Sequence, residues 1–272
     1  MSDGSRIKLL SPLIRRIPVE SIEDVLLVMD TIDTQLTNED GLWWFNLLYR
    51  MVTREILEDC RREAWRSPAW LIRLDVEFAK LYFDAICLWE ESPDQTPNAW
   101  RALFERRSSS HIAPLQYGMA GMNAHINRDL PLAVVRACEQ CGCSPRAGTA
   151  EQDDYIRVNK ILDEVEIRAM QRMATGWIKR VSDTINPVDR KVAISVVARA
   201  RAQAWVHAER YWAYGQAGQQ KRQQTLIRRL DGIAYKIGQA LLLPTFTQSS
   251  PPSLLTLARR WREKYTGVSD KR

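Results

Sequence analysis

Apolar residues recur at three- and four-residue intervals along most of this 272-residue chain, and this spacing constrains the fold more than any other feature. One such stripe runs from Trp70 to Ile86. Its members share one face of a helix but would scatter over both faces of a strand. Only 12 residues are glycine, and they gather in short breaks between the periodic segments. The sequence therefore predicts an all-α protein, a single large helical bundle of about eight to ten helices.

Local signals mark where several helices begin and end. Ser21 and the acidic residue three positions later form a capping box, which predicts a helix start. Pro68 is placed to open a long helix. We expect a helix over Leu115–Leu130, with Pro131 at its end or at the start of the next helix. The Gly- and Pro-containing stretch 141–149 is the clearest internal loop.

The formal net charge of +6 is concentrated at the two ends of the chain. We expect residues 1–17 to form a basic N-terminal extension, residues 18–243 a helical domain, and residues 244–272 a linker and a basic C-terminal helix. The middle of the chain is then close to neutral and lacks the basic stripe that a groove for nucleic-acid phosphates requires. Nucleic acid is therefore disfavoured as a partner, and the oligomeric state is left open.

Two further features bear on the membrane and on the cellular compartment. The sequence has no run of about 18 uncharged apolar residues, so no membrane span is predicted. Arg6 and Lys8 interrupt the N-terminal segment, which argues against the apolar core of a secretory signal. The five cysteines, an odd number, fit reduced thiols. We therefore expect a cytoplasmic protein.

Polar residues on otherwise apolar helix faces are the candidates for chemistry. His125 lies among small and apolar neighbours, and Asp129 follows one helical turn later on the same face. Three interpretations of this pair remain open: a buried structural hydrogen bond, two ligands of one divalent metal ion, or a metal-free acid/base pair in which the carboxylate orients the imidazole.

Two more carboxylates are candidates for the same site. Asp75 interrupts the apolar stripe of its helix, and a carboxylate on such a face must reach water or find a partner. Asp154 opens a later helical segment, where it is either a further catalytic carboxylate or a first-turn residue favoured by the helix dipole.

Aromatic and amide side chains supply the candidates for the wall of an apolar ligand cavity. The chain has 10 tryptophans and 8 tyrosines. Most are expected to fill the core, and the rest could line a cavity. The candidate lining residues are Phe78, Tyr82, Asn127, Asn159 and Trp205.

Several known motifs are missing from the sequence. It contains no Glu-x-x-His pair, which disfavours a di-iron helical bundle. Asp153 and Asp154 are not followed by the third acidic residue of an isoprenoid-synthase motif, because Arg157 takes that position. No glycine-rich phosphate loop and no Gly-x-Ser-x-Gly elbow is present.

Three segments carry a family resemblance: 73–86, 121–134 and 154–162. They resemble an uncharacterised all-helical family of bacterial and fungal proteins, known as a domain of unknown function, whose most specific element is His-Ile-Asn-x-Asp-Leu-Pro at 125–131. The resemblance covers roughly residues 20–240 and implies a single α-helical domain with no established activity. The His-x-x-x-Asp pair also resembles a fragment of the helical zinc-dependent phospholipase C and nuclease family. Those sites use more histidines than the three found here.

The leading hypothesis is a cytoplasmic enzyme that acts on a small, largely apolar molecule, for example in natural-product tailoring. His125 would be the metal ligand or general base, Asp129 the co-ligand or orienting group, and Asp75 or Asp154 a further carboxylate. A single divalent metal ion is the cofactor in the first case. The rival hypothesis is a non-catalytic module that binds a small molecule or a protein, in which these residues form a structural polar network.

Overall fold

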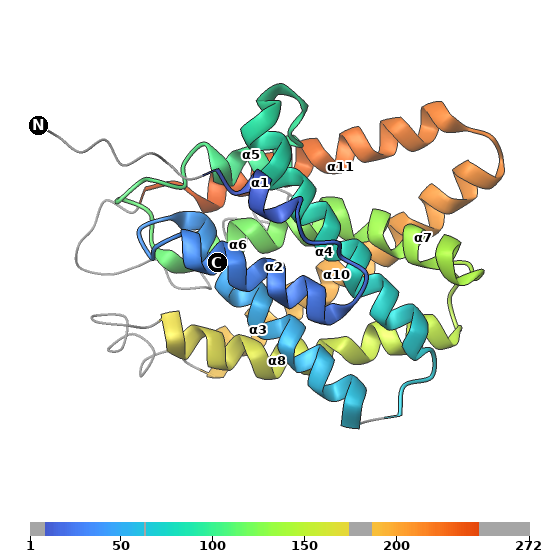
Figure 1. The fold of residues 1–272 in the computed structure, drawn as a ribbon. Helices are drawn as coiled ribbons and strands as arrows, with labels where there is room; N and C mark the ends of the chain where they lie inside the picture. Colours follow the sequence, from blue (N-terminus) through green and yellow to red (C-terminus); the bar gives the residue numbers. More distant parts are fainter. Residues whose placement is uncertain (1–8, 63, 174–186, 245–272) are drawn as a thin grey trace, which may run out of the picture.

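The computed structural model describes residues 9–62, 64–173 and 187–244 (Figure 1). Every regular element in these ranges is helical and none is a strand, which confirms the predicted all-α class and the helical bundle. The elements follow in the order α1 (Ser11–Ile14), α2 (Ile22–Gln35), α3 (Gly41–Arg62), α4 (Pro68–Glu91), η1 (Pro93–Gln95), α5 (Asn98–Phe104), α6 (Pro114–Ala124), η2 (His125–Asp129), α7 (Leu130–Cys141), α8 (Ala150–Met173), α10 (Pro187–Gln216) and α11 (Gln220–Leu241).

Helix α2 begins where the capping box was predicted. The Ser21 hydroxyl accepts a hydrogen bond from the backbone N–H of Asp24, and the Asp24 carboxylate accepts one from the backbone N–H of Ser21. Pro68 is the first residue of α4, where its missing N–H leaves no gap in the helix. Helix α7 ends at Cys141, and Gly142 then takes a φ of 66°, the left-handed conformation that suits glycine.

A π-helical segment, η2, joins α6 to α7 in one continuous helical path. Pro131 is the second residue of α7, one position after Leu130. Proline cannot donate to the carbonyl four residues earlier, and its ring clashes with that carbonyl in a regular α-helix. The wider π turn relieves this clash. Pro131 was expected at the end of one helix or at the start of the next, and it lies at the start of α7.

The buried apolar side chains form two clusters. One is built mainly from α2, α3, α5, α6 and the end of α11. The other is built mainly from α7, α8 and α10. Helix α4 contributes to both and runs through the middle of the bundle (Figure 1). Phe78 on α4 packs against both clusters, so the boundary between them lies at this residue.

Part of the segment predicted as an N-terminal extension packs onto the helical domain. Leu10 and Ile14 are buried. The Glu90 carboxylate accepts hydrogen bonds from the backbone N–H groups of Leu10 and Ser11. This part of the segment therefore contacts the helices, while the predicted domain bounds at residues 17/18 and 243/244 stay a prediction. The predicted basic helix in 244–272 lies outside the described residues. None of the described helices has the length and hydropathy that spanning a bilayer requires.

Candidate functional site

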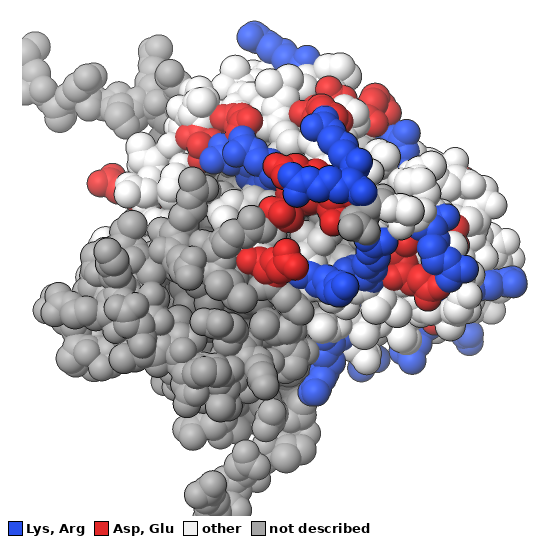
Figure 2. All heavy atoms as spheres, turned by 90° about the horizontal axis from the view of Figure 1, so that it is seen from below, with Lys and Arg blue, Asp and Glu red and all other residues white. Residues whose placement is uncertain are grey.

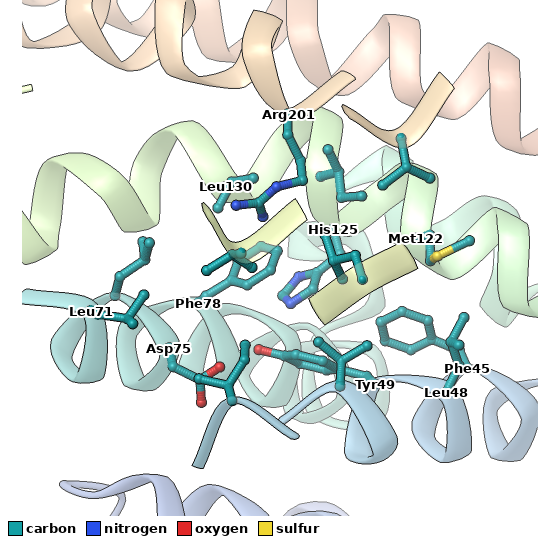
Figure 3. Close-up of a pocket in the computed structure, with 17 residues that line it drawn as sticks. Phe45, Leu48, Tyr49, Leu71, Asp75, Phe78, Met122, His125, Leu130 and Arg201 are labelled. Atoms are coloured by element: carbon teal, nitrogen blue, oxygen red, sulfur yellow. The ribbon is translucent and has the colours of Figure 1, made fainter. Parts of the chain in front are cut away.

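An apolar cavity of about 80 Å³ lies where the two clusters meet (Figure 3). Helices α3, α4, α8 and α10 line it together with the path through α6, η2 and α7. Such a volume has room for a few waters or for part of a small ligand. The apolar lining residues are Phe45, Leu48, Val52, Ile56, Leu71, Leu74, Phe78, Met122, Ile126, Leu130, Val158, Leu162 and Val197. The other lining residues are Tyr49, Asp75, His125 and Arg201.

His125 is fixed in one orientation. Its Nδ1 lies 3.1 Å from Oδ2 of Asp129, and its ring stacks on Phe78 with the two centroids 3.4 Å apart. Because an ionised carboxylate only accepts hydrogen bonds, Nδ1 must carry the proton and Nε2 keeps its lone pair. Nε2 is buried and has no hydrogen-bond partner within the described residues. Figure 3 shows the imidazole between Phe78 and Tyr49 at the cavity.

The two oxygens of Asp129 are fully engaged. Oδ2 accepts a second hydrogen bond from Nε1 of Trp100 at 2.8 Å, and Oδ1 accepts one from Arg128 at 2.6 Å. Burial opposes a charge on this carboxylate, but the Arg128 guanidinium and the hydrogen bond from His125 outweigh it, so the pKa of Asp129 lies below its ordinary value. Asp129 is therefore an ionised group that orients His125.

Burial also decides the protonation of His125. Removal from water disfavours the imidazolium and lowers the pKa of His125, while the nearby Asp129 opposes this shift only in part. The imidazole is therefore neutral near pH 7. A neutral imidazole with a free Nε2 is the form that can accept a proton.

Asp75 brings a carboxyl group to the same cavity from α4. It is only 5% exposed, and its Oδ2 has no hydrogen-bond partner among the described residues. Burial raises the pKa of Asp75 to about 7. A carboxyl group with such a pKa is partly protonated at neutral pH and can donate a proton.

The Tyr49 hydroxyl is the third polar atom at the cavity without a partner in the described ranges. Burial raises its pKa well above the ordinary value, with the Asp75 carboxylate adding to the shift, so the hydroxyl stays protonated. It points between Asp75 and His125 in Figure 3. It can therefore donate a hydrogen bond to a bound molecule.

The structure brings together four of the residues that the sequence singled out. His125, Asp75 and Phe78 line the cavity, and Asp129 lies directly behind the imidazole. Tyr82, also predicted to line the cavity, does not: its ring lies 6.2 Å from that of His125, between centroids, and its hydroxyl faces Asn46.

Asp154 is placed elsewhere. Its two carboxylate oxygens accept hydrogen bonds from the backbone N–H groups of Arg66 and Ser67 at the start of α4. These N–H groups have no partner within the helix, so Asp154 satisfies them from α8. The structure therefore does not bring Asp154 to the site for which the sequence proposed it, because the side chain faces this helix terminus and not the cavity.

The remaining predicted lining residues also lie outside the cavity lining. Asn127 donates a hydrogen bond to Asn123, its neighbour one turn earlier. Trp205 packs against Trp70, with ring centroids 6.0 Å apart. Asn159 accepts a hydrogen bond from Nε of Arg201 and so reaches the cavity only through that residue.

Sequence reasoning missed Tyr49 and Arg201. Tyr49 belongs to an apolar stripe, and nothing in the sequence separates it from ordinary core aromatics. Arg201 did carry a signal, because it shares one face of its helix with the apolar residues Val197 and Ala208. A charged residue on such a face is the same kind of signal that identified Asp75.

A metal ion does not suit this set of donors. Both oxygens of Asp129 and Nδ1 of His125 are occupied by each other and by Trp100 and Arg128. Nε2 of His125 and the Asp75 carboxylate remain, fewer than the three protein ligands of a typical zinc site. No cluster of three His, Cys, Asp or Glu side chains suited to a metal occurs in the part of the chain that the structure describes.

Fold and site together define an all-α protein in which a buried His–Asp pair faces an apolar cavity. The family of unknown function DUF5995 matches residues 22–244, and the chain belongs to this family. The match runs from the start of α2 past the end of α11 and includes every cavity residue. It confirms the expected membership of an unknown-function family, while the assignment of a His-Ile-Asn-x-Asp-Leu-Pro motif and of a bacterial and fungal range stays a prediction. Neither the curated proteins nor the solved structures include a match to this chain.

Proposed function

We propose that this chain is a cytoplasmic enzyme that moves protons on a small, largely apolar molecule, without a metal ion. The observation that carries the proposal is the convergence on one apolar cavity of three buried polar atoms that lack partners among the described residues: Nε2 of His125, Oδ2 of Asp75 and the Tyr49 hydroxyl. Each such atom costs the folded state about 1–3 kcal/mol. Several buried polar atoms without hydrogen-bond partners in one cavity are typical of a binding site, because a bound ligand supplies the missing partners.

Each residue has a role that follows from its environment. His125 is the general base, and Asp129 is a positioning residue that holds the tautomer with Nε2 free. Asp75 is the general acid, and Tyr49 hydrogen-bonds to a polar atom of the substrate. The same burial lowers the pKa of His125 and raises that of Asp75 to about 7. Acid and base are therefore both in their working protonation states near neutral pH.

The cavity wall supports the apolar character of the substrate. Thirteen of the 17 lining residues are aliphatic, aromatic or Met side chains. An apolar wall excludes water, which strengthens electrostatic interactions with the few polar groups inside. The stacked Phe78 ring also keeps the imidazole from turning away.

Two other observations support the compartment and the kind of partner. All five cysteines are free, which suits a reducing cytoplasm. Basic and acidic side chains alternate on the described part of the face in Figure 2. Among the described residues, Arg50 pairs with Asp30 and Arg61 with Glu23. A surface whose positive charges are neutralised in this way does not favour nucleic acid.

Deuterium labelling tests the proposed reaction although the substrate is unidentified. Purified protein is incubated in deuterated water with a mixture of small apolar metabolites, and deuterium incorporation is measured by mass spectrometry. We expect the wild type to label at least one compound and His125→Gln to slow this labelling by about 10²–10⁴-fold, the usual contribution of a general base. Asp94→Asn, an exposed change on η1, is the matched control. A folded His125→Gln protein that labels at the wild-type rate refutes the proposal.

The second candidate function is a non-catalytic small-molecule binding module. The saturated hydrogen bonding of Asp129 favours it, because this half of the site forms the structural network that such a module needs. Under this alternative, ligand-detected NMR shows compounds that bind in a His125-dependent way, and none of them takes up deuterium.

A further inference from the structure

A buried guanidinium that has no anionic partner among the described side chains also lines the cavity. Arg201 on α10 is 5% exposed. Its Nε donates to Oδ1 of Asn159 and its Nη2 to the backbone carbonyl of Tyr155, both at 2.8 Å. Its Cζ lies 4.3 Å from the ring centroid of Tyr155. All of these partners are neutral, and none of the carboxylates whose side chains the structure describes forms an ion pair with Arg201.

This arrangement leaves the charge of Arg201 uncompensated. A guanidinium stays protonated in proteins, although burial lowers the pKa of Arg201. Buried charges in proteins are nearly always paired, because removal from water costs several kcal/mol per ion. The two hydrogen bonds fix the guanidinium in place and occupy Nε and Nη2, and Nη1 donates no hydrogen bond to the described protein.

The geometry points to a small apolar carboxylic acid as the ligand of this cavity, with its carboxylate paired to Arg201 and its body against Phe78 and the aliphatic wall. This inference rests on the proposed function, because it assigns the substrate class of the same site. Arg201 enters the cavity from the side opposite Asp75 and Tyr49 in Figure 3. A ligand anchored at Arg201 would therefore extend past the imidazole of His125 toward the other two polar groups.

The single positive charge in the cavity lining favours a carboxylate over a phosphate as the anionic group of the ligand. Arg201 is the one cation among the 17 described residues that line the cavity, and they include no Lys. A single guanidinium balances a monoanion, whereas a phosphate monoester carries close to two charges near pH 7. A planar carboxylate also matches the planar guanidinium.

Matched acids and amides test the inference on the wild-type protein. Straight-chain carboxylates from propanoate to octanoate and their primary amides have nearly the same shape but differ in charge. Their affinities are measured by titration calorimetry at about pH 6, where the carboxylates are ionised and Asp75 is mostly protonated. We expect at least one acid to bind about tenfold or more tightly than its amide, as a charge-assisted hydrogen bond allows. Equal affinity of every acid and its amide, or no binding of either series, overturns the inference.

Variants locate the charge that discriminates. In Arg201→Gln the preference for acid over amide should disappear, and in Arg201→Lys it should be retained in part. Arg199→Gln removes an exposed charge from the same helix and should leave the preference unchanged. A preference that survives in folded Arg201→Gln overturns the inference. If Arg201→Gln does not fold, the comparison of acids with amides on the wild type still decides.

The two proposals fail in different ways. Amides that bind as well as acids, together with His125-dependent deuterium labelling, would leave the proton-transfer proposal standing and remove the carboxylate. Acids that bind through Arg201 without any deuterium labelling would support the carboxylate ligand and remove the proton-transfer proposal.

Discussion

Removing the charge of Asp75 should stabilise the folded protein at alkaline pH. Burial raises the pKa of this carboxyl from the ordinary value of 3.8 to about 7. Between these two values the folded state binds more protons than the unfolded state, so the contribution of Asp75 to stability falls as the pH rises through this window. Three pH units at about 1.4 kcal/mol per unit give a loss of about 4 kcal/mol once both states are ionised.

Urea unfolding of the wild type and of Asp75→Asn, at pH values from about 5 to about 8.5, measures this contribution directly. Asparagine keeps the shape and cannot ionise. The difference in unfolding free energy between the variant and the wild type should therefore grow with pH in favour of the variant, by about 3 kcal/mol across this range, because only about two pH units of the window lie above pH 5. Asp94→Asn, an exposed substitution on η1, is the matched control. A pH-independent difference for Asp75→Asn would refute the reasoning, since it would mean that the carboxyl group is hydrated or paired.

Three further predictions concern stability. Asp129→Asn should destabilise the protein by about 3–5 kcal/mol in urea unfolding, because it breaks a buried charged network; a neutral effect would contradict its positioning role. Gly121→Ala should lower the free energy of unfolding by about 1–3 kcal/mol, because the new Cβ overlaps the ring of Phe45. In Gly232→Ala the new Cβ meets nothing within 4 Å, so this change should be neutral or stabilising. Equal effects of the two changes would count against the packing described. Asp154→Ala should lower stability by about 1–2 kcal/mol, as loss of a helix cap does, and calorimetry should show carboxylate affinity unchanged; a large loss of affinity would return Asp154 to the site.

The helices could be predicted from the sequence because their signals are local. The capping box at Ser21 and the proline at position 68 act within one turn, and the structure places α2 and α4 where they indicate. Apolar stripes of constant period likewise identify long helices without reference to their neighbours.

The site could be predicted only in part, because it depends on which helices face each other. His125 and Asp75 were recognisable as polar residues on apolar faces. Asp154 has the same appearance in the sequence, yet it faces the start of α4. The π turn before Pro131 also shifts the face of α7 relative to α6, which a constant helical period does not anticipate.

The roles proposed for the site all depend on a neutral His125 imidazole that presents a bare Nε2 to the cavity. The chain has three histidines, so long-range ¹H–¹⁵N correlation spectra of the labelled protein can resolve each ring, and the spectrum of His125→Gln assigns the missing one. At about pH 7 we predict an Nδ1–H tautomer with an unprotonated Nε2, in accord with the downward shift of its pKa. A doubly protonated ring at this pH, or a proton on Nε2 instead of Nδ1, would contradict the assignment of His125 as the base.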